Sequence, residues 1–295
     1  MFVAKNSKIF VFILVLLVVI SLGSIAKYGL NLGMDFTGGS RLEVDYPKGL
    51  PDMTKVRTAV DALNLNAVVQ PIGAMGLMIK ARDLKESDRV ALVSALSIDG
   101  TEVVDKQFTS IGPTIGGELK TKAIYSILLV LIAIALFVSY AFRKVSGAVK
   151  SWEYGMATIL SLAHDVIIPL GIFAYLGHLY GIEVDSLFVT ALLTILGFSV
   201  HDTIVVFDRI RENLKLKKSK DFTEIVGMSL YQTVSRSINT SLAVVLTLLA
   251  LLYFGSESVR YFCLTMIVGI IAGTYSSVLL ASPILVVIQG WKTKK

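Results

Sequence analysis

Apolar residues in this chain occur in long unbroken runs, a pattern that predicts membrane-spanning helices. Four runs contain no charged residue, and each of two more is interrupted by a single acidic residue. Because about 20 helical residues cross a hydrocarbon core of about 30 Å, we count six spans. We expect the first helix within residues 1–28 and the other five within residues 122–291, at 123–142, 155–177, 186–207, 236–256 and 261–288, followed by a cytoplasmic tail at 292–295. Ser282-Pro283 is expected to kink or end the last helix.

The segment between the first two spans, residues 29–121, is polar and large enough to form a domain of its own. Its alternating and helix-spaced apolar positions predict strands and helices in the order βαββαβ, typical of a ferredoxin-like fold. The expected elements are the strand 41–46, the helix 53–63, the strands 66–72 and 77–81, the helix 84–96 and the strand 101–109. The segment lacks a His cluster, a Gly-rich phosphate loop and a nucleophile–base pairing, so binding or mechanical coupling is favoured over catalysis. The whole chain is therefore predicted to be an α-helical polytopic membrane protein with one ferredoxin-like α+β domain.

Composition supports this class and narrows the alternatives. Of the 295 residues, 17% are charged, whereas soluble domains average about 25%, which argues against a soluble enzyme or a disordered chain. The single cysteine, Cys263, excludes a disulfide framework and a Cys-rich zinc site. Ser24-Ile25-Ala26 resembles a signal-peptide cleavage site, but the apolar stretch is long for a signal peptide, so we expect an uncleaved anchor.

Charge distribution predicts the orientation in the membrane. The positive-inside rule places the segments rich in Lys and Arg in the cytoplasm, so both termini are expected inside and the α+β domain outside. The fourteen basic residues on the inner side would be Lys5, Lys8, Arg143, Lys144, Lys150, Arg209, Arg211, Lys215, Lys217, Lys218, Lys220, Lys292, Lys294 and Lys295. The net charge of +6 is then a topological signal, and we expect no nucleic-acid partner.

Three ionisable residues fall within the predicted spans: Asp165, Asp202 and Arg236. A charge at such depth is costly, which makes each a functional-site hypothesis. A carboxyl in a medium of low dielectric constant holds its proton, and a nearby guanidinium favours its release, so Asp202 and Arg236 could form a proton relay. Two structural alternatives stay open: an ion pair between Asp202 and Arg236, and a helix-packing hydrogen bond between Asp165 and His164.

The sequence offers no sign of a metal or cofactor. The histidines lack the i, i+4 spacing of a zinc protease, and no GxxxxGK[ST] nucleotide motif occurs. His201 directly precedes Asp202, so on a helix the two side chains point about 100° apart around the axis. His201 is therefore expected to be a neighbour of Asp202 and not a direct hydrogen-bond partner. Energy for any work must therefore come from an ion gradient or from a partner protein.

Five ordered motifs resemble the SecD/SecF family of protein-export membrane proteins. They are a DF-x-GG signature with Asp35, Phe36, Gly38 and Gly39, a GP-x-x-G entry with Gly112 and Pro113, His164-Asp165-Val166, the run 197–213 with Asp202, Asp208 and Arg209, and the run 235–241 with Arg236. The single outer domain of under 100 residues is similar to the branch of the family with the smaller outer region.

This resemblance implies a function and partners. It implies that Asp202 and Arg236 belong to a proton pathway, with Asp165 as a further member and His164 and His201 as tuning residues; relatives often have Asn where this chain has His201. It implies a subunit in the bacterial cytoplasmic (inner) membrane that uses the proton gradient to promote late-stage translocation of preproteins. The implied partners are SecD, the SecYEG channel, the translocating preprotein and, further, YajC and YidC, with ATP hydrolysed by the translocase motor.

Three alternatives remain. A small-molecule exporter of the related RND type would need substrate-sized clefts in large outer domains. An intramembrane enzyme would need Asp165 and Asp202 within about 8 Å so that they share a proton. A passive assembly factor would tolerate Asp202→Asn.

Overall fold

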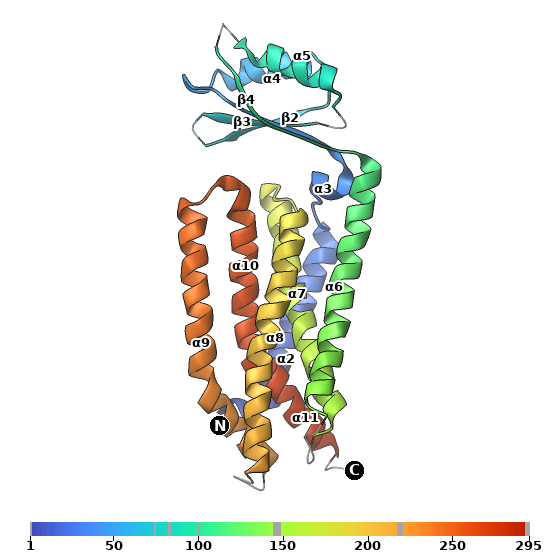
Figure 1. Cartoon of the computed structure of the whole chain (residues 1–295), viewed down its shortest axis with the longest axis vertical. Helices are drawn as coiled ribbons and strands as arrows, with labels where there is room; N and C mark the ends of the chain where they lie inside the picture. The colour runs from blue at the N-terminus through green and yellow to red at the C-terminus, as the bar shows by residue number, and fades with distance from the viewer. Residues whose placement is uncertain are drawn as a thin grey trace. The chain divides into compact units, whose positions relative to one another are not determined.

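The computed structural model describes residues 2–73, 75–81, 84–98, 101–143, 149–216 and 221–292, apart from the side chains of Phe2 and Glu257. Six of the predicted inner-side lysines lie outside the described residues: Lys144, Lys217, Lys218, Lys220, Lys294 and Lys295. The chain divides into two compact units, residues 1–31 with 124–295 and residues 32–123. The first unit is a helix bundle and the second an α+β domain, so each is described by itself (Figure 1).

Among the described residues, six helices are long and apolar enough to cross a membrane, as predicted. They are α2 (Ser7–Tyr28), α6 (Pro113–Ala141), α7 (Ser151–Tyr180), α8 (Ser186–Lys215), α9 (Phe222–Phe254) and the continuous run of α10 (Glu257–Ser276), a π-helical turn (Ser277–Ala281) and α11 (Ser282–Lys292), with a short α1 (Phe2–Lys5) before them. Together with the antiparallel sheet described below, they confirm the predicted fold class.

Several helices extend well beyond the predicted spans. The predicted fifth span begins at residue 236, whereas α9 begins 14 residues earlier, at Phe222. Asp221 caps this helix, because its Oδ1 accepts the backbone N–H of Thr223 at 3.0 Å. Similarly, α8 continues to Lys215 through a charged last turn. A count of uncharged residues stops at the first charge, while the helical hydrogen bonds continue past it.

The last helix contains a π-helical turn next to its proline. Pro283 has no N–H, and its ring would clash with the carbonyl four residues earlier in a regular α-helix. The chain widens at Ser277–Ala281, and the Ser282 Oγ donates to the Ser277 carbonyl at 3.3 Å. Of the two predicted outcomes at Ser282-Pro283, a kink or an end, the helix does not end there: it is disturbed by the irregular turn, and α11 continues to Lys292.

Close helix packing in the bundle depends on small residues. A Cβ at Gly171 of α7 would lie 2.4 Å from the Ser21 Cβ of α2, and the Ser24 Oγ donates to the Gly171 carbonyl at 2.9 Å. On α10, a Cβ at Gly273 would lie 2.8 Å from the Ser199 Cβ of α8. Lipid tails are as apolar as the side chains, so the hydrophobic effect contributes little to the association of membrane helices. Close packing contacts such as these stabilise the bundle instead. The contact at Gly273 also brings α10 and α8 together beside the candidate site.

The α+β unit has the predicted element order and the ferredoxin-like sheet. Its elements are the short helix α3 (Met34–Thr37), β1 (Gly39–Asp45), α4 (Met53–Asp61), β2 (Val68–Ile72), β3 (Gly76–Ala81), α5 (Glu86–Leu96) and β4 (Val104–Ile111). The strand order is β2-β3-β1-β4, and every neighbouring pair is antiparallel. Figure 1 shows α4 and α5 on one face of this sheet. The buried core between them includes Leu42, Val44, Val56, Val60, Leu77, Ile79, Leu92 and Leu96.

Both edge strands of the sheet carry an irregularity. On β2, Pro71 offers no N–H to a further strand. On β4, Lys106 has no partner on β1, because Glu43 pairs with Gln107 and Val44 pairs with Asp105. Lys106 is therefore a bulged residue, and its Nζ forms an ion pair of 2.5 Å with Asp45.

The two glycines of the DF-x-GG motif lie where the chain passes the start of α6. Gly38 has a φ of +75°, and a Cβ there would lie 2.7 Å from the Pro113 Cα. On α6, a Cβ at Gly116 would lie 2.8 Å from the Gly38 backbone nitrogen. Pro113 begins α6, a position that suits proline because the first N–H groups of a helix have no intrahelical partner. Side chains are excluded where these two segments meet, which accounts for Gly38 and Pro113 as motif positions.

Asp52 caps α4 and makes the α+β unit sensitive to acid. Its Oδ1 accepts the Thr54 backbone N–H at 2.8 Å, and this bond holds the pKa of Asp52 below its usual value. The cap stabilises the unit fully above about pH 5 and is lost as the pH falls through the lowered pKa, below about pH 4. Asp52→Ala is expected to lower the thermal midpoint at pH 7, with a difference from the native chain that narrows as the pH falls. Thermal melts from pH 3 to pH 7 test this; a difference independent of pH would contradict it.

Candidate functional site

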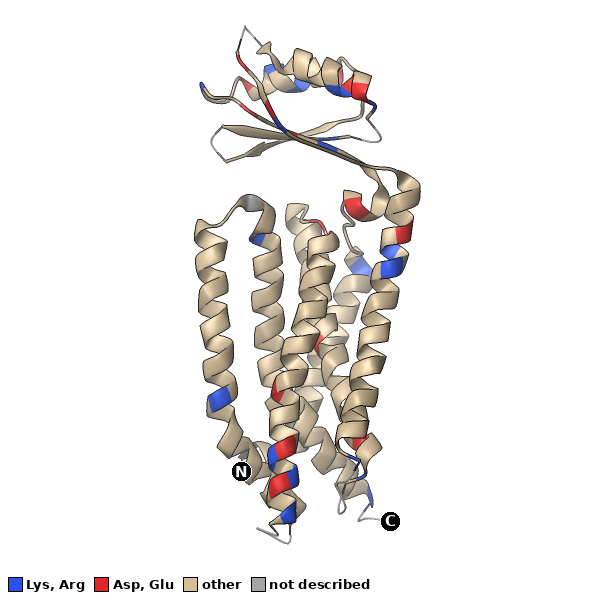
Figure 2. Ribbon diagram, in the orientation of Figure 1, with Lys and Arg blue, Asp and Glu red and all other residues tan. Residues whose placement is uncertain are grey.

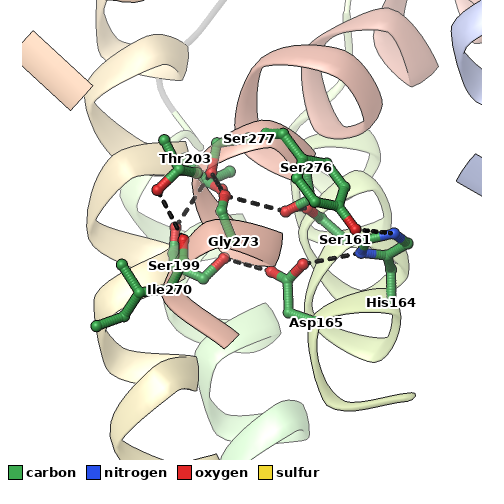
Figure 3. A network of polar contacts seen from close by, with 11 residues as sticks. Ser161, His164, Asp165, Ser199, Thr203, Ile270, Gly273, Ser276 and Ser277 are labelled. Atoms are coloured by element: carbon green, nitrogen blue, oxygen red, sulfur yellow. Dashed lines mark hydrogen bonds and ion pairs between the residues drawn. The ribbon is translucent and has the colours of Figure 1, made fainter. Parts of the chain in front are cut away.

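Asp165 lies in the middle of α7 with no exposed surface, and both of its carboxylate oxygens have partners (Figure 3). The His164 Nδ1 lies 2.9 Å from Oδ1, and the Ser199 Oγ of α8 donates to Oδ2 at 2.5 Å. A carboxyl in a membrane bundle requires such partners, because the hydrocarbon around it offers none. The predicted hydrogen bond between Asp165 and His164 is present, and Ser199 extends it to a second helix.

The contacts of His164 continue to α10. The Tyr275 hydroxyl lies 3.4 Å from the His164 Nε2, and the two rings are nearly perpendicular, with centroids 5.4 Å apart. One turn before His164, the Ser161 Oγ donates to the Ser276 Oγ of α10 at 3.1 Å. Helix α7 is thus hydrogen-bonded to α10 on one side and to α8 on the other.

A second group of contacts joins α8 to the π-helical turn. The Thr203 and Ser277 hydroxyls lie 3.0 Å apart, and the Ser277 Oγ also donates to the Gly273 carbonyl at 2.8 Å (Figure 3). The Ser199 carbonyl lies 3.4 Å from the same Ser277 oxygen. Ser199, which holds Asp165, is therefore tied through its backbone to the irregular turn of the last membrane helix. Hereafter, polar network denotes Ser161, His164, Asp165, Ser199, Thr203, Tyr275, Ser276 and Ser277.

Sequence reasoning identified Asp165 and His164 but missed the other members of the polar network. Uncharged Ser, Thr and Tyr residues within apolar runs carry no signal of their own. A usable signal was the GxxxG spacing of Gly269 and Gly273, which marks a face where two membrane helices approach closely. In the structure this face of α10 meets Ile195 and Ser199 of α8.

Asp202 lies three residues beyond Ser199 on α8, about 4.5 Å further along the helix axis. Its side chain is nearly buried, and its Oδ1 lies 3.9 Å from the Nδ1 of His201, whose own side chain is 61% exposed. His201 is thus a loose neighbour of Asp202. Arg236 of α9 is exposed, and among the described residues it forms no ion pair with Asp202. The alternative of a structural Asp202–Arg236 ion pair is therefore wrong for this state of the protein.

The two interior carboxyls have separate partners. Asp165 is held by His164 and Ser199, whereas Asp202 lies beside His201. Within the described parts of the chain, no hydrogen bond joins the two carboxyls, and no group of three His, Cys, Asp or Glu side chains could hold a metal ion. The direct contact through which two aspartates share a proton is thus not present among these described residues.

The charged end of α8 fastens that helix to α9. The Arg209 Nε donates to the Gln232 Oε1 at 2.6 Å, and Arg209 also pairs with Glu212 at 2.5 Å. The buried Asn213 amide donates to Ser229 at 2.8 Å. Asp208, the other motif residue in this region, pairs with Arg211 on the same helix. In Figure 2 the ribbon is coloured for charged residues along this end of α8. The contacts above give Asp208 and Arg209 a structural role.

The remaining motif residues lie in the α+β unit. Phe36 is buried in α3, next to Asp35. Gly39 has a φ of +143°, and Gly112 accepts the Gly116 N–H at 3.0 Å just before α6. None of these residues belongs to the polar network, and their described contacts shape the chain where β1 begins and β4 ends.

Taken together, the fold and the site define a polytopic membrane protein with two buried carboxyls inside its helix bundle, one of them held by hydrogen bonds, and one ferredoxin-like domain. Residues 93–291 match the family described as protein export membrane protein SecD/SecF, C-terminal, and residues 23–46 match the SecD/SecF GG motif. The chain belongs to the SecD/SecF family of protein-export membrane proteins.

Similar proteins cover nearly the whole chain. Protein translocase subunit SecF of Thermobaculum terrenum is 40% identical over 97% of this chain and 92% of its own length. The SecF subunit of Pseudomonas aeruginosa is 35% identical over 92% of this chain and 86% of its own. These similarities place the chain among protein translocase subunits of the SecF type and set the small-molecule exporter aside.

A solved structure supports the same fold. The crystal structure of SecDF, a translocon-associated membrane protein from Thermus thermophilus, is 33% identical and superposes with a TM-score of 0.82. The match covers 98% of this chain but only 38% of that longer chain. A second structure, SecDF in a super-membrane-facing form, gives a TM-score of 0.71 at 32% identity.

Proposed function

We propose that this chain, with SecD, uses the proton-motive force to promote late-stage translocation of preproteins across the bacterial cytoplasmic membrane. The observation that carries the proposal is the separation of Asp202 from Arg236: both are ionisable residues within membrane helices, and they form no ion pair. Two ionisable residues of opposite charge kept at that depth without an ion pair between them are expected to have a function. The similarity to SecF subunits supplies the process that it would drive.

The proposed relay depends on movement of Arg236 relative to Asp202. When the Arg236 guanidinium is distant, the protonated form of the nearly buried Asp202 carboxyl is favoured. When the guanidinium approaches, the carboxylate form is favoured. One cycle of approach and departure would take up a proton on one side of the membrane and release it on the other. In this proposal His201, whose Nδ1 lies 3.9 Å from the Asp202 carboxyl, tunes the exchange, and Asp165 takes part as a second carboxyl.

The exposed position of Arg236 also supports a membrane partner. Gln232, Arg236 and Asn239 follow one another at spacings of four and three residues on α9, and all three are exposed. The Gln232 oxygen accepts hydrogen bonds from Arg209 and Asn213, but the Arg236 guanidinium and the Asn239 amide would be costly if they faced lipid, so a second membrane protein is expected to cover this stripe. The longer SecDF chain, of which this chain matches 38%, favours SecD as that partner. SecYEG, YajC and YidC remain proposed partners on family resemblance.

We further propose that both termini are cytoplasmic and that the α+β unit is extracytoplasmic. Cys263 is the only cysteine, so a Cys263→Ala chain can carry single reporters. Lys48→Cys reports on the α+β unit and Lys215→Cys on the end of α8, since both positions are exposed. A membrane-impermeant maleimide is expected to label Lys48→Cys in right-side-out vesicles and Lys215→Cys only in inverted ones. The reverse pattern would contradict the proposed orientation.

The function is tested with inverted membrane vesicles depleted of this chain. Preprotein import is measured with and without a proton gradient, before and after the chain is restored together with SecD. The gradient is expected to accelerate translocation only after restoration. Equal acceleration in depleted and restored vesicles would show that the chain does not couple the gradient to translocation.

A further inference from the structure

The π-helical turn at Ser277–Ala281 divides the last membrane helix into two parts that are held in different ways. The inner part, α11, is fixed to the bundle. The Lys292 Nζ forms an ion pair with Glu153 of α7, whose side chain has no exposed surface, and Leu285 is fully buried as well. A π-helical turn contains one residue more than the α-helical turn that it replaces, and such turns occur frequently at functional sites. The outer part, α10, is therefore one residue out of register with α11.

Opposing features act on this extra residue. Pro283 favours the π-helical turn, because its ring would clash with the Leu279 carbonyl in a regular α-helix. The contact of 3.0 Å between the hydroxyls of Ser277 and Thr203 on α8 favours it too. The backbone itself favours the α-helix, since π-helical turns are rare in proteins. The extra residue is thus retained by one proline and by contacts with a neighbouring helix.

Closing the π-helical turn into a regular α-helix would move α10 by one residue, a rotation of about 100° and a shift of about 1.5 Å. Each place on α10 would then be occupied by the following residue. Ser277 would take the place of Ser276, which accepts a hydrogen bond of 3.1 Å from the Ser161 Oγ of α7. Because Ser276 and Ser277 are identical, this hydrogen bond can form in both registers.

On the side of α8, only the present register fits. Val278 would take the place of Ser277, so the hydroxyl contact with α8 would be lost. Thr274 would take the place of Gly273, where an added Cβ lies 2.8 Å from the Ser199 Cβ. Close approach of two membrane helices depends on small residues at such positions. The step would therefore separate α8 from α10, while the hydrogen bond between α7 and α10 is kept.

We propose that the last membrane helix is a two-register switch: the Asp165 carboxylate holds the π-helical register, and the neutral acid allows the turn to close. The inference rests on the proposed proton-coupled function. Ser199 provides the link, because its Oγ donates to the Asp165 Oδ2 at 2.5 Å and its carbonyl accepts from the Ser277 Oγ at 3.4 Å. A carboxylate holds a donor more strongly than a neutral acid does. Proton uptake at Asp165 thus loosens Ser199 and with it the contact between α8 and α10.

The titratable groups around Asp165 fit this coupling. On α7 the His164 Nδ1 lies 2.9 Å from the Asp165 Oδ1, and on α10 the Tyr275 hydroxyl lies 3.4 Å from the His164 Nε2. Asp202 lies one turn further along α8, and Arg236 of α9 is exposed. The step of α10 would also move Tyr275 away from His164, so it alters the surroundings of Asp165 from a second side.

Two pairs of cysteines in a Cys263→Ala chain report the two registers. Ser161→Cys with Ser276→Cys brings the thiols together in the π-helical register, and Ser161→Cys with Ser277→Cys does so after the step. Each chain is reconstituted with SecD in proteoliposomes, and the disulfide yield is measured after brief oxidation. Asp165→Asn, a neutral substitute, is expected to raise the yield of the second pair relative to the first about tenfold, as for the loss of one hydrogen bond to a charged group.

Pro283→Ala provides a second test, which decides the matter if Asp165→Asn fails to fold. Without the ring the clash is absent, so the yield of the second pair is expected to rise relative to the first here too. Asn213→Cys with Ser229→Cys is the control pair, because these side chains join α8 to α9 and not to α10. Its yield is expected to stay unchanged in both variants. An unchanged ratio of the two reporter pairs in folded Asp165→Asn would overturn the switch.

Function provides a further readout. The disulfide between Ser161→Cys and Ser276→Cys locks the π-helical register, so gradient-stimulated translocation is expected to fall to background and to return on reduction. A full rate in the locked chain would also overturn the switch. If Asp202→Asn leaves the gradient response intact, the proposed function fails. If Asp202→Asn abolishes the response while the ratio of the reporter pairs stays unchanged in Asp165→Asn, the switch alone fails.

Discussion

Asp202→Asn is expected to abolish the gradient-stimulated part of preprotein translocation and to leave the gradient-independent part intact. The amide has the shape of the carboxyl but cannot take up or release a proton, so the proposed exchange with Arg236 stops. Asp202 is nearly buried, and its neighbours include His201 at 3.9 Å and Ser237, with which an asparagine side chain can still form a hydrogen bond, so the fold should tolerate the change. Loss of a positioned proton-transfer group typically costs about 10²–10⁴-fold in rate, so the stimulated component should fall to background.

The measurement uses inverted vesicles with and without an ionophore that collapses the gradient. Asp208→Asn is a matched control, because Asp208 lies on the same helix six residues further along and pairs with Arg211 at the exposed end. This control is expected to keep the native response to the gradient. A native response in Asp202→Asn as well would remove the relay and favour a passive assembly role.

Gly38→Ala is expected to destabilise the α+β unit by about 3 kcal/mol, the largest stability effect that we predict for a single methyl group. Gly38 has a φ of +75°, which residues with a Cβ rarely adopt, and the new Cβ would lie 2.7 Å from the Pro113 Cα. The clash is with backbone, so a side-chain rotation cannot relieve it. Either the chain before β1 or the start of α6 must move.

Two adjacent glycines of α6 provide the control. A Cβ at Gly116 would lie 2.8 Å from the Gly38 nitrogen, whereas one at Gly117 would meet open space. Gly116→Ala should therefore lower the free energy of unfolding, and Gly117→Ala should raise it by about 0.5–1 kcal/mol through helix propensity. Amide exchange of the β1 and β4 backbone in the full chain measures all three variants. Equal effects at Gly116 and Gly117 would contradict the proposed contact.

The fold could be predicted from the sequence largely because each element has a strong local pattern. Four uncharged runs and two runs interrupted by a single acidic residue revealed six spans, and alternation around Leu42 and Val44 revealed a half-buried strand. The ends of the helices were harder to predict. Helix α9 begins at Phe222, but its first turns are amphipathic and Arg236 interrupts the apolar run, so the sequence pattern marked only the later part of the helix. The π-helical turn before Pro283 depends on how the last helix relieves a local clash, which hydrophobicity does not encode.

The candidate site could be predicted only where it is charged. Asp165 and Asp202 stood out within apolar runs, and His164 stood out as the neighbour of Asp165. Ser199 and Tyr275 could not be assigned, because their importance comes from contacts between α7, α8 and α10. The separation of Asp202 from Arg236 likewise depends on the rotation of α8 and α9 about their axes, a tertiary property.

The irregular sheet edges of the α+β unit have a consequence for a protein that works beside unfolded chains. An exposed strand edge offers a row of free N–H and C=O groups, and an extended polypeptide could adopt it as a template and adhere. Pro71 interrupts one such row and the bulge at Lys106 the other. Cargo that touches this domain during export would thus find no long backbone ladder to join, and it could leave again without first being pulled out of a sheet.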